Sequence, residues 1–156
     1  MILYHSSSEV VRCPDTAHSR LYLDFGKGFY LTSYYEQARR YAERFLRRGR
    51  EAWLNTYGLI DNLERWKILR FDSYDKAWLD FISKCRGGND DTDYDMVIGG
   101  IANDRVILTL DRYFDGELTQ EQALGLLKFE KPNIQYCIRS ERMLKECLTY
   151  IKSEQL

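Results

Sequence analysis

The sequence predicts a single domain of the α+β class. Its 156 residues are the usual length of one domain with its own hydrophobic core. Apolar residues recur at helical spacing in some segments and alternate with polar residues in others, so both helices and strands are expected. The two kinds of segment do not alternate regularly along the chain, and no linker, repeat or low-complexity tract divides them. We therefore expect one mixed domain covering residues 1–156.

The first part of the chain is expected to contain three strands and one long helix. Ile2 to His5 forms the first strand, and residues 11–22 form an irregular loop. Residues 34–48 form the helix, because apolar side chains there recur at i, i+3, i+4, i+7 and i+8. Two strands follow, from Leu54 to Ile60 and from Lys67 to Phe71. The apolar side of the helix is formed by Ala38, Tyr41, Ala42, Phe45 and Leu46.

A second helix is expected at residues 74–85, where large apolar side chains share one face. The polar loop from Gly87 to Asp93 follows it. Asp90, Asp91 and Asp93 are expected to be solvated, because the loop lacks the closing glutamate of a calcium-binding loop. Asp95 to Ile98 is expected to be a strand that ends at Gly99-Gly100. The helix face consists of Trp78, Phe81, Ile82 and Cys85.

Cap signals mark three helices in the last part of the chain, one at residues 104–114, one at 120–127 and one at the C-terminus. An alternating strand from Ile134 to Arg139 precedes the last helix. The capping residues are Asn103, the Thr119–Gln122 capping box and Ser140. The apolar face of the last helix is expected to comprise Leu144, Cys147, Leu148 and Ile151.

Bulk composition indicates no particular partner. The formal net charge is −1, so the overall charge points neither to a nucleic acid nor to a membrane. No apolar run approaches the roughly 18 residues of a membrane span, and the N-terminus lacks a signal-peptide pattern, so a cytoplasmic location is expected. The cysteines are scattered without a C-x-x-C pair, so we expect free thiols and no metal site. They are Cys13, Cys85, Cys137 and Cys147.

The most informative stretch is Gly26-Lys27-Gly28-Phe29-Tyr30. Its glycines allow positive φ and a close approach of a flat ligand to the main chain. The Tyr30 ring offers a face for stacking, and His5 offers a ring nitrogen for a hydrogen bond. Together these residues are suited to a pocket for a planar aromatic ligand with an attached sugar.

The segments LYHSS, LDFGKGFYLT and EQARRYA resemble, in that order, the first two motifs of the ADP-ribosyltransferase superfamily. Within that superfamily they resemble the histidine–tyrosine–glutamate branch. With YDMVIGGIAND and NIQYCIRSERML, nearly the whole chain is similar to a bacterial family of the DUF3990 type. The resemblance implies a split β-sheet core with flanking helices, in one ADP-ribosyltransferase-like domain.

The resemblance also implies roles for individual residues around a molecule of NAD. His5 would bond the adenosine-side ribose, Tyr30 would stack on the nicotinamide, and Gln135 would occupy the place of the catalytic glutamate. Further NAD-binding positions are Ser6, Ser7, Arg20, Gly26, Lys27, Gly28, Phe29, Thr32 and Tyr41. Structural alternatives stay open for several of them. His5 can be a surface residue at the end of its strand, and Tyr30 can be a core residue. Arg20 and Lys27 can be solvated loop residues. Tyr41 fits the apolar stripe of its helix and can pack in the core.

Gln135 departs from the pattern of the resembled superfamily. Its strand is expected to place Gln135, Cys137 and Arg139 on one side and Ile134, Tyr136 and Ile138 on the other. Cleavage of NAD builds positive charge on the ribose, which a carboxylate stabilises. Glutamine keeps a hydrogen bond but supplies no charge, which argues against polymer synthesis and leaves mono-ADP-ribosyl transfer open. Carboxylates that could help are Glu141, Asp104 and Asp95.

The expected function is therefore that of an NAD-dependent mono-ADP-ribosyltransferase acting on a macromolecule, protein or nucleic acid. The resemblance further implies the toxin of a bacterial toxin–antitoxin pair, with a small antitoxin protein as partner and no membrane partner. The alternatives are an NAD- or ADP-ribose-binding module without turnover, favoured by Gln135, and an interaction domain. The arginine run within residues 34–50 is typical of a solvated helix face, and it could also bind an acidic partner or a nucleic-acid backbone.

Overall fold

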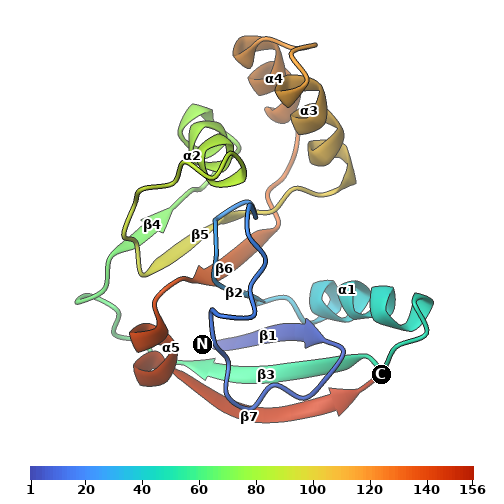
Figure 1. Cartoon of the computed structure of the whole chain (residues 1–156), viewed down its shortest axis with the longest axis vertical. Helices are drawn as coiled ribbons and strands as arrows, with labels where there is room; N and C mark the ends of the chain where they lie inside the picture. Colours follow the sequence, from blue (N-terminus) through green and yellow to red (C-terminus); the bar gives the residue numbers. More distant parts are fainter.

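The computed structural model describes residues 1–156 and confirms the α+β class. Seven strands form one mixed sheet in the order β4-β5-β6-β2-β1-β3-β7, with five helices around it (Figure 1). The strands are β1 (Ile2–Ser7), β2 (Phe29–Thr32), β3 (Trp53–Leu59), β4 (Ile68–Arg70), β5 (Met96–Gly100), β6 (Ile134–Ile138) and β7 (Leu148–Gln155). The helices are α1 (Tyr35–Arg47), α2 (Lys76–Arg86), α3 (Asp104–Phe114), α4 (Gln120–Leu127) and α5 (Glu141–Cys147).

The sheet narrows where β1 meets β2. These two strands pair only at Tyr4 and Thr32. By contrast, β2 pairs with β6 from Phe29 to Thr32, and β1 pairs with β3 along its whole length. The sheet therefore consists of two ladders, β4-β5-β6-β2 and β1-β3-β7, joined through one residue pair. We call this place the junction.

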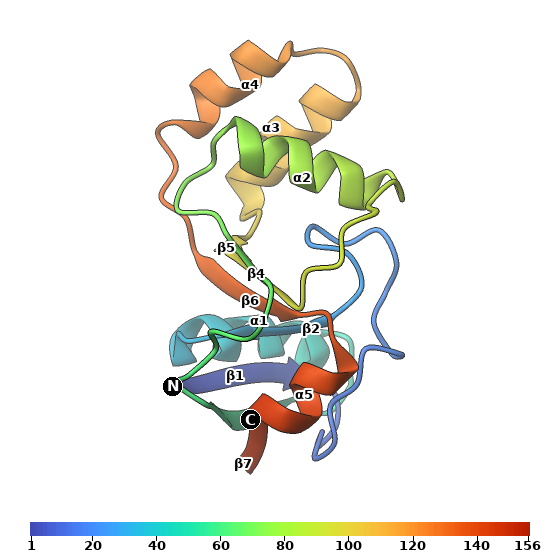
Figure 2. The same cartoon turned by 90° about the vertical axis from the view of Figure 1, so that its left-hand side faces the viewer.

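Each face of the sheet has its own hydrophobic core. On one face, Leu3, Phe29 and Ile138 pack with Met143 and Leu144 of α5. On the other, Cys137 and Val97 belong to the core that includes α2, α3 and α4. Figure 2 shows these three helices together at one end of the molecule, with α1 and α5 beside the β1-β3-β7 ladder. The other main members of this second core are Phe25, Trp78, Val106, Leu110 and Leu127.

The predicted caps explain where three helices begin. The side chain of Asn103 accepts a hydrogen bond from the Val106 backbone at 3.0 Å. Thr119 and Gln122 form both bonds of the capping box, and the Ser140 hydroxyl accepts from the Met143 backbone at 3.2 Å. Each bond satisfies a backbone N–H that the first helical turn leaves without a partner.

The C-terminal helix is shorter than its apolar pattern predicts. It ends at Cys147, and Leu148–Gln155 forms β7, which pairs antiparallel with β3. The prediction that Leu148 and Ile151 continue the helix is wrong. The run from Leu148 to Ile151 is rich in aromatic and branched side chains, which favour a strand. Pairing with β3 also covers what would otherwise be an open sheet edge.

Gly99 and Gly100 are the last two residues of β5, so the strand includes them and does not stop at Ile98 as expected. A Cβ at Gly100 would stand 2.5 Å from Cε1 of Tyr74, and one at Gly99 would stand 3.2 Å from Cζ of Phe25. The glycines therefore allow aromatic side chains of the second core to pack directly on the strand.

Helix α1 contacts the sheet through small residues. Ala38 and Ala42 are buried, whereas Tyr41 is 46% and Leu46 45% exposed. The apolar side expected for this helix is therefore only partly buried: Tyr41 does not pack in the core, which was its structural alternative, and the two alanines let the helix lie close to β1. No helix in the structure is both long enough and apolar enough to span a membrane.

Candidate functional site

His5 of β1 is held against β2 at the junction. Its Nδ1 lies 2.8 Å from the carbonyl oxygen of Tyr30, and its ring rests on Phe29 at a centroid distance of 4.3 Å. Burial lowers the pKa of His5, although the bond to the Tyr30 carbonyl acts in the opposite direction. A neutral ring that donates from Nδ1 keeps Nε2 as a free acceptor.

Tyr30 closes the turn that precedes β2. Its hydroxyl donates to the Gly26 carbonyl at 2.5 Å and accepts from the Phe25 backbone at 3.1 Å. The ring lies nearly parallel to that of Phe25, and burial raises the pKa of the phenol, which stays protonated. Tyr30 is thus a partly buried packing residue, and its stacking on nicotinamide stays a prediction.

Gln135 of β6 stands directly opposite Thr32 of β2. Paired residues point to the same side of a sheet, so Gln135, Thr32 and Tyr30 share one face. The Thr32 hydroxyl lies 3.3 Å from Oε1 of Gln37 on α1. His5, stacked on Phe29, faces the other side. The structure therefore brings the predicted catalytic residues onto adjacent strands but divides them between the two faces.

The remaining predicted binding residues have separate surroundings. The Ser6 hydroxyl donates to the Ala38 carbonyl at 2.5 Å and ties β1 to α1, while Ser7 accepts from the Glu9 backbone. Arg20 is exposed in the loop after β1. Tyr41 lies on the outer side of α1 beneath the Arg44 guanidinium.

A cavity of about 610 Å³ lies beside the turn at Gly26 and Lys27. The loop at residues 16–27 forms one side, residues 90–95 form another, and Arg139, which follows β6, contributes to the lining. Gly28 completes the turn: a Cβ there would stand 2.5 Å from Sγ of Cys137. The second motif is therefore pressed against β6, and two of its residues line the cavity.

Arg139 and Asp90 form an ion pair at this cavity, and each side chain is only 12% exposed. Burial acts to raise the pKa of Asp90, but hydrogen bonds from Thr92 and the Arg139 charge hold it below its ordinary value. The prediction that Asp90 is solvated is wrong, because Arg139 reaches across from the end of β6. The placement of Arg139 on the same side of its strand as the apolar Cys137 was the only signal of this in the sequence.

Two of the carboxylates considered as substitutes for the missing glutamate have structural partners. Glu141 accepts hydrogen bonds from the backbone and the hydroxyl of Thr16, at 2.5 and 2.7 Å. Asp95 accepts from the Lys67 backbone at 2.9 Å. Asp104 is exposed in the first turn of α3. The geometry thus commits Glu141 and Asp95 to holding loops in place.

The fold and the site define an α+β protein with a mixed sheet, a narrow junction and a cavity beside the turn before β2. The profile of one protein family matches residues 1–150, and the chain belongs to this family, described as protein of unknown function (DUF3990). No curated protein and no solved structure shows a significant match to the chain.

Proposed function

We propose that this protein is an NAD-dependent mono-ADP-ribosyltransferase that acts on a macromolecule. The observation that carries the proposal is the adjacency of three strands: β1 with His5, β2 with Tyr30 and β6 with Gln135. These are the residues that match the three motifs of the resembled superfamily. The division of the sheet into two ladders at the junction also fits the split core of that superfamily.

The cavity supports the proposal by its size and by its place beside the second motif, while none of His5, Tyr30 and Gln135 lines it. About 610 Å³ falls in the range of roughly 300–1,000 Å³ that is usual for small-molecule sites. Gly26 and Lys27 of the second motif line it, and Lys27 offers a positive charge for a pyrophosphate. Asp93 and Asp95 line the same cavity, so a pyrophosphate would have to lie on the side of Lys27. Asp90 balances the charge of Arg139, so Arg139 serves mainly to shape this end of the site.

In this proposal Gln135 binds a ribose hydroxyl of NAD, and it does not stabilise the developing positive charge. A neutral amide can keep the hydrogen bond of the usual glutamate without its electrostatic contribution. We therefore expect slow cleavage of the nicotinamide bond by the natural protein. Gln135→Glu restores the carboxylate and is expected to preserve or raise the rate.

The first test measures NAD binding by calorimetry and nicotinamide release by the purified protein. Tyr30→Ala is expected to weaken binding by about 1–3 kcal/mol through lost stacking. Tyr30→Phe keeps the ring and should keep most of the binding. His18→Gln is the control, because His18 is an exposed residue of the 11–22 loop. The proposal is wrong if the wild-type protein neither binds NAD nor releases nicotinamide.

We further propose that the protein is the toxin of a toxin–antitoxin pair, which rests on the sequence resemblance alone. Tightly controlled expression in bacteria should arrest growth and leave ADP-ribose on a macromolecule, and Tyr30→Ala should abolish both effects. Digestion of the labelled product with nuclease or protease identifies the acceptor class. The toxin assignment would be contradicted if cells grew normally while the expressed protein was active and ADP-ribose was found on a macromolecule.

A binding module without turnover is the second candidate, and Gln135 favours it. Neither residue paired with Gln135 in the sheet, Thr32 or Gly99, supplies a carboxylate. This candidate predicts clear NAD or ADP-ribose binding with no release of nicotinamide, even by the Gln135→Glu variant.

A further inference from the structure

One side of α1 carries a concentrated positive charge that the proposed NAD site does not use. Residues 34–50 contain six arginines and two glutamates, a net charge of +4. The whole chain carries −1, so the remaining residues carry −5. A net excess of positive charge is thus gathered on one helix and its flanks, while the remaining residues have a net negative charge.

The arginines follow the outer side of the helix. At 3.6 residues per turn, Arg40, Tyr41, Arg44 and Arg47 fall within an arc of about 120°, and Tyr34 and Arg48 flank the helix as its N-cap and C-cap residues. This arc is turned away from Ala38 and Ala42, which pack on the sheet. All six side chains are exposed, and we call them the α1 stripe: Tyr34, Arg40, Tyr41, Arg44, Arg47 and Arg48.

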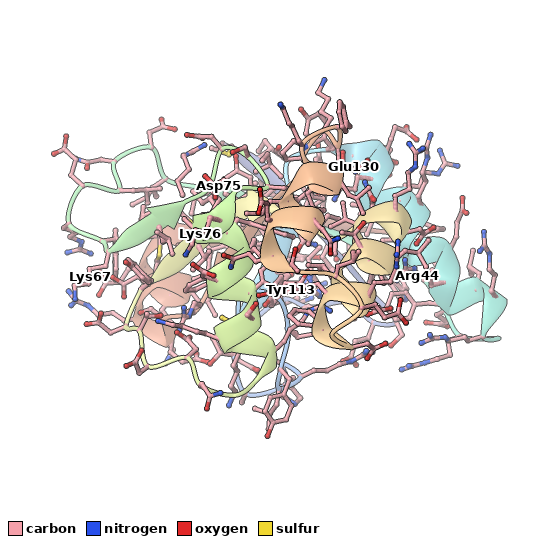
Figure 3. The ribbon with its side chains drawn as sticks, turned by 90° about the horizontal axis from the view of Figure 1, so that it is seen from above. Arg44, Lys67, Asp75, Lys76, Tyr113 and Glu130 are labelled. Atoms are coloured by element: carbon pink, nitrogen blue, oxygen red, sulfur yellow. The ribbon has the colours of Figure 1, made fainter.

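Most of this charge is free for a partner. Only Arg47 of the stripe has an ion-pair partner, Glu43 at 3.5 Å, and its side chain is still 77% exposed. The Arg44 guanidinium lies over the Tyr41 ring, 4.7 Å from the centroid. Figure 3 shows Arg44 on α1, on the side of the molecule opposite Lys67.

We propose that the α1 stripe binds a single-stranded nucleic acid. Guanidinium groups form paired hydrogen bonds with phosphate oxygens, and all the cations of the stripe are arginines. Tyr34 is 61% and Tyr41 46% exposed, and exposed rings beside arginines are where unpaired bases stack. An acidic peptide would satisfy the arginines but would leave both rings without a planar partner. In a duplex the bases already stack on one another, so a single strand is the better fit.

The stripe also lies close to the junction. Helix α1 begins three residues after β2 ends, and Gln37 in its first turn is within hydrogen-bond distance of Thr32. A strand bound along the stripe therefore passes near the paired residues Thr32 and Gln135. The inference concerns binding alone and does not rest on NAD chemistry.

The test measures fluorescence anisotropy of labelled 20-nucleotide RNA and DNA single strands with the full-length protein, without NAD. The stripe variant carries Arg40→Gln, Arg44→Gln and Arg47→Gln. The control carries Arg105→Gln, Lys128→Gln and Lys131→Gln, three exposed residues of the α3–α4 region that give the same change in net charge. Circular dichroism establishes that both variants are folded.

The stripe variant should bind at least about tenfold more weakly at about 50 mM salt. The number of counterions released on binding, obtained from the salt dependence of the affinity, should fall by roughly two. The control should stay within about twofold of wild type. Tyr41→Ala should weaken binding roughly tenfold with little change in salt dependence. Equal losses in both triple variants, or competition by polyglutamate as strong as that by RNA, would overturn the proposal. Tighter binding of a matched duplex would overturn the single-strand assignment.

Discussion

The imidazole Nδ1 of His5 lies 2.8 Å from the carbonyl oxygen of Tyr30, and this contact joins the two ladders of the sheet. β1 and β2 otherwise pair only at Tyr4 and Thr32. A single side chain therefore reinforces the narrowest part of the sheet. The bond also fixes which ring nitrogen of neutral His5 carries the proton.

Acid is expected to weaken the fold through His5. Its pKa is lowered from 6.5 by burial, so as the pH falls the unfolded chain takes up a proton at a higher pH than the folded chain does. The free energy of unfolding should therefore fall as the pH is lowered from about 7 to 5, and be fully regained above about 7. His5→Gln, which can still donate to the Tyr30 carbonyl, should flatten this dependence in urea unfolding.

The other histidine supplies the control. Asp15 raises the pKa of His18 by hydrogen bonding, so any stability from His18 is present at low pH and lost as the pH rises. His18→Gln should leave the acid-side loss in place. If His5→Gln and wild type lose stability in parallel between pH 7 and 5, His5 is not the titrating group.

Gly28→Ala should destabilise the protein by about 1–3 kcal/mol, because a Cβ there meets Sγ of Cys137 at 2.5 Å and the Ile138 carbonyl at 2.8 Å. Gly125 of α4 is the matched comparison, since a Cβ there meets nothing within 4 Å. Gly125→Ala should stabilise by about 0.5–1 kcal/mol through its helix propensity. Thermal and urea unfolding measure the change in stability of both variants. If Gly28→Ala leaves the stability unchanged, the turn is not packed tightly against β6.

Removing one partner of the Asp90–Arg139 pair should lower the free energy of unfolding by about 2–4 kcal/mol, because it leaves a mostly buried charge unpaired. A double-mutant cycle of Asp90→Ala and Arg139→Ala measures the coupling. The exposed pair Glu43–Arg47 is the control, and its coupling should be below about 0.5 kcal/mol. Similar coupling in both cycles would mean that water reaches Asp90 freely.

One thiol should react in the native protein, that of Cys13. It is exposed, whereas Cys85, Cys137 and Cys147 are buried. Burial raises the pKa of Cys85 and of Cys137 to about 12, which further suppresses their reaction. Titration with a thiol reagent at pH 8 should label one cysteine rapidly and all four after denaturation. Rapid labelling of the Cys13→Ser variant would show that one of the elements with a buried cysteine, α2, β6 or α5, opens locally in the native protein.

The sequence predicted the local features well where a single residue controls a backbone choice. Asn103, Thr119 and Ser140 cap helices because their short polar side chains can accept a bond from the third residue of the helix. The alternation from Ile134 to Ile138 likewise separates the two cores. Both signals lie within a few residues along the chain.

Prediction from the sequence failed where a residue far away in the chain determined the local structure. Leu148 and Ile151 keep helical spacing, yet the open edge of β3 draws them into β7. Asp90 lies in a loop of polar residues, yet Arg139, 49 residues away, encloses it. The outward position of Tyr41 depended on which side of α1 packs on β1.

The amino-acid sequence by itself therefore determined the α+β class, most of the elements and the family motifs. Only the tertiary structure decided that His5 and Gln135 face opposite sides of the sheet, and that a cavity lies beside Gly26 and Lys27. The physical reason is that periodicity records which side of its own element a residue occupies. The register between β1, β2 and β6 sets how those sides meet, and it depends on contacts between residues far apart in the chain.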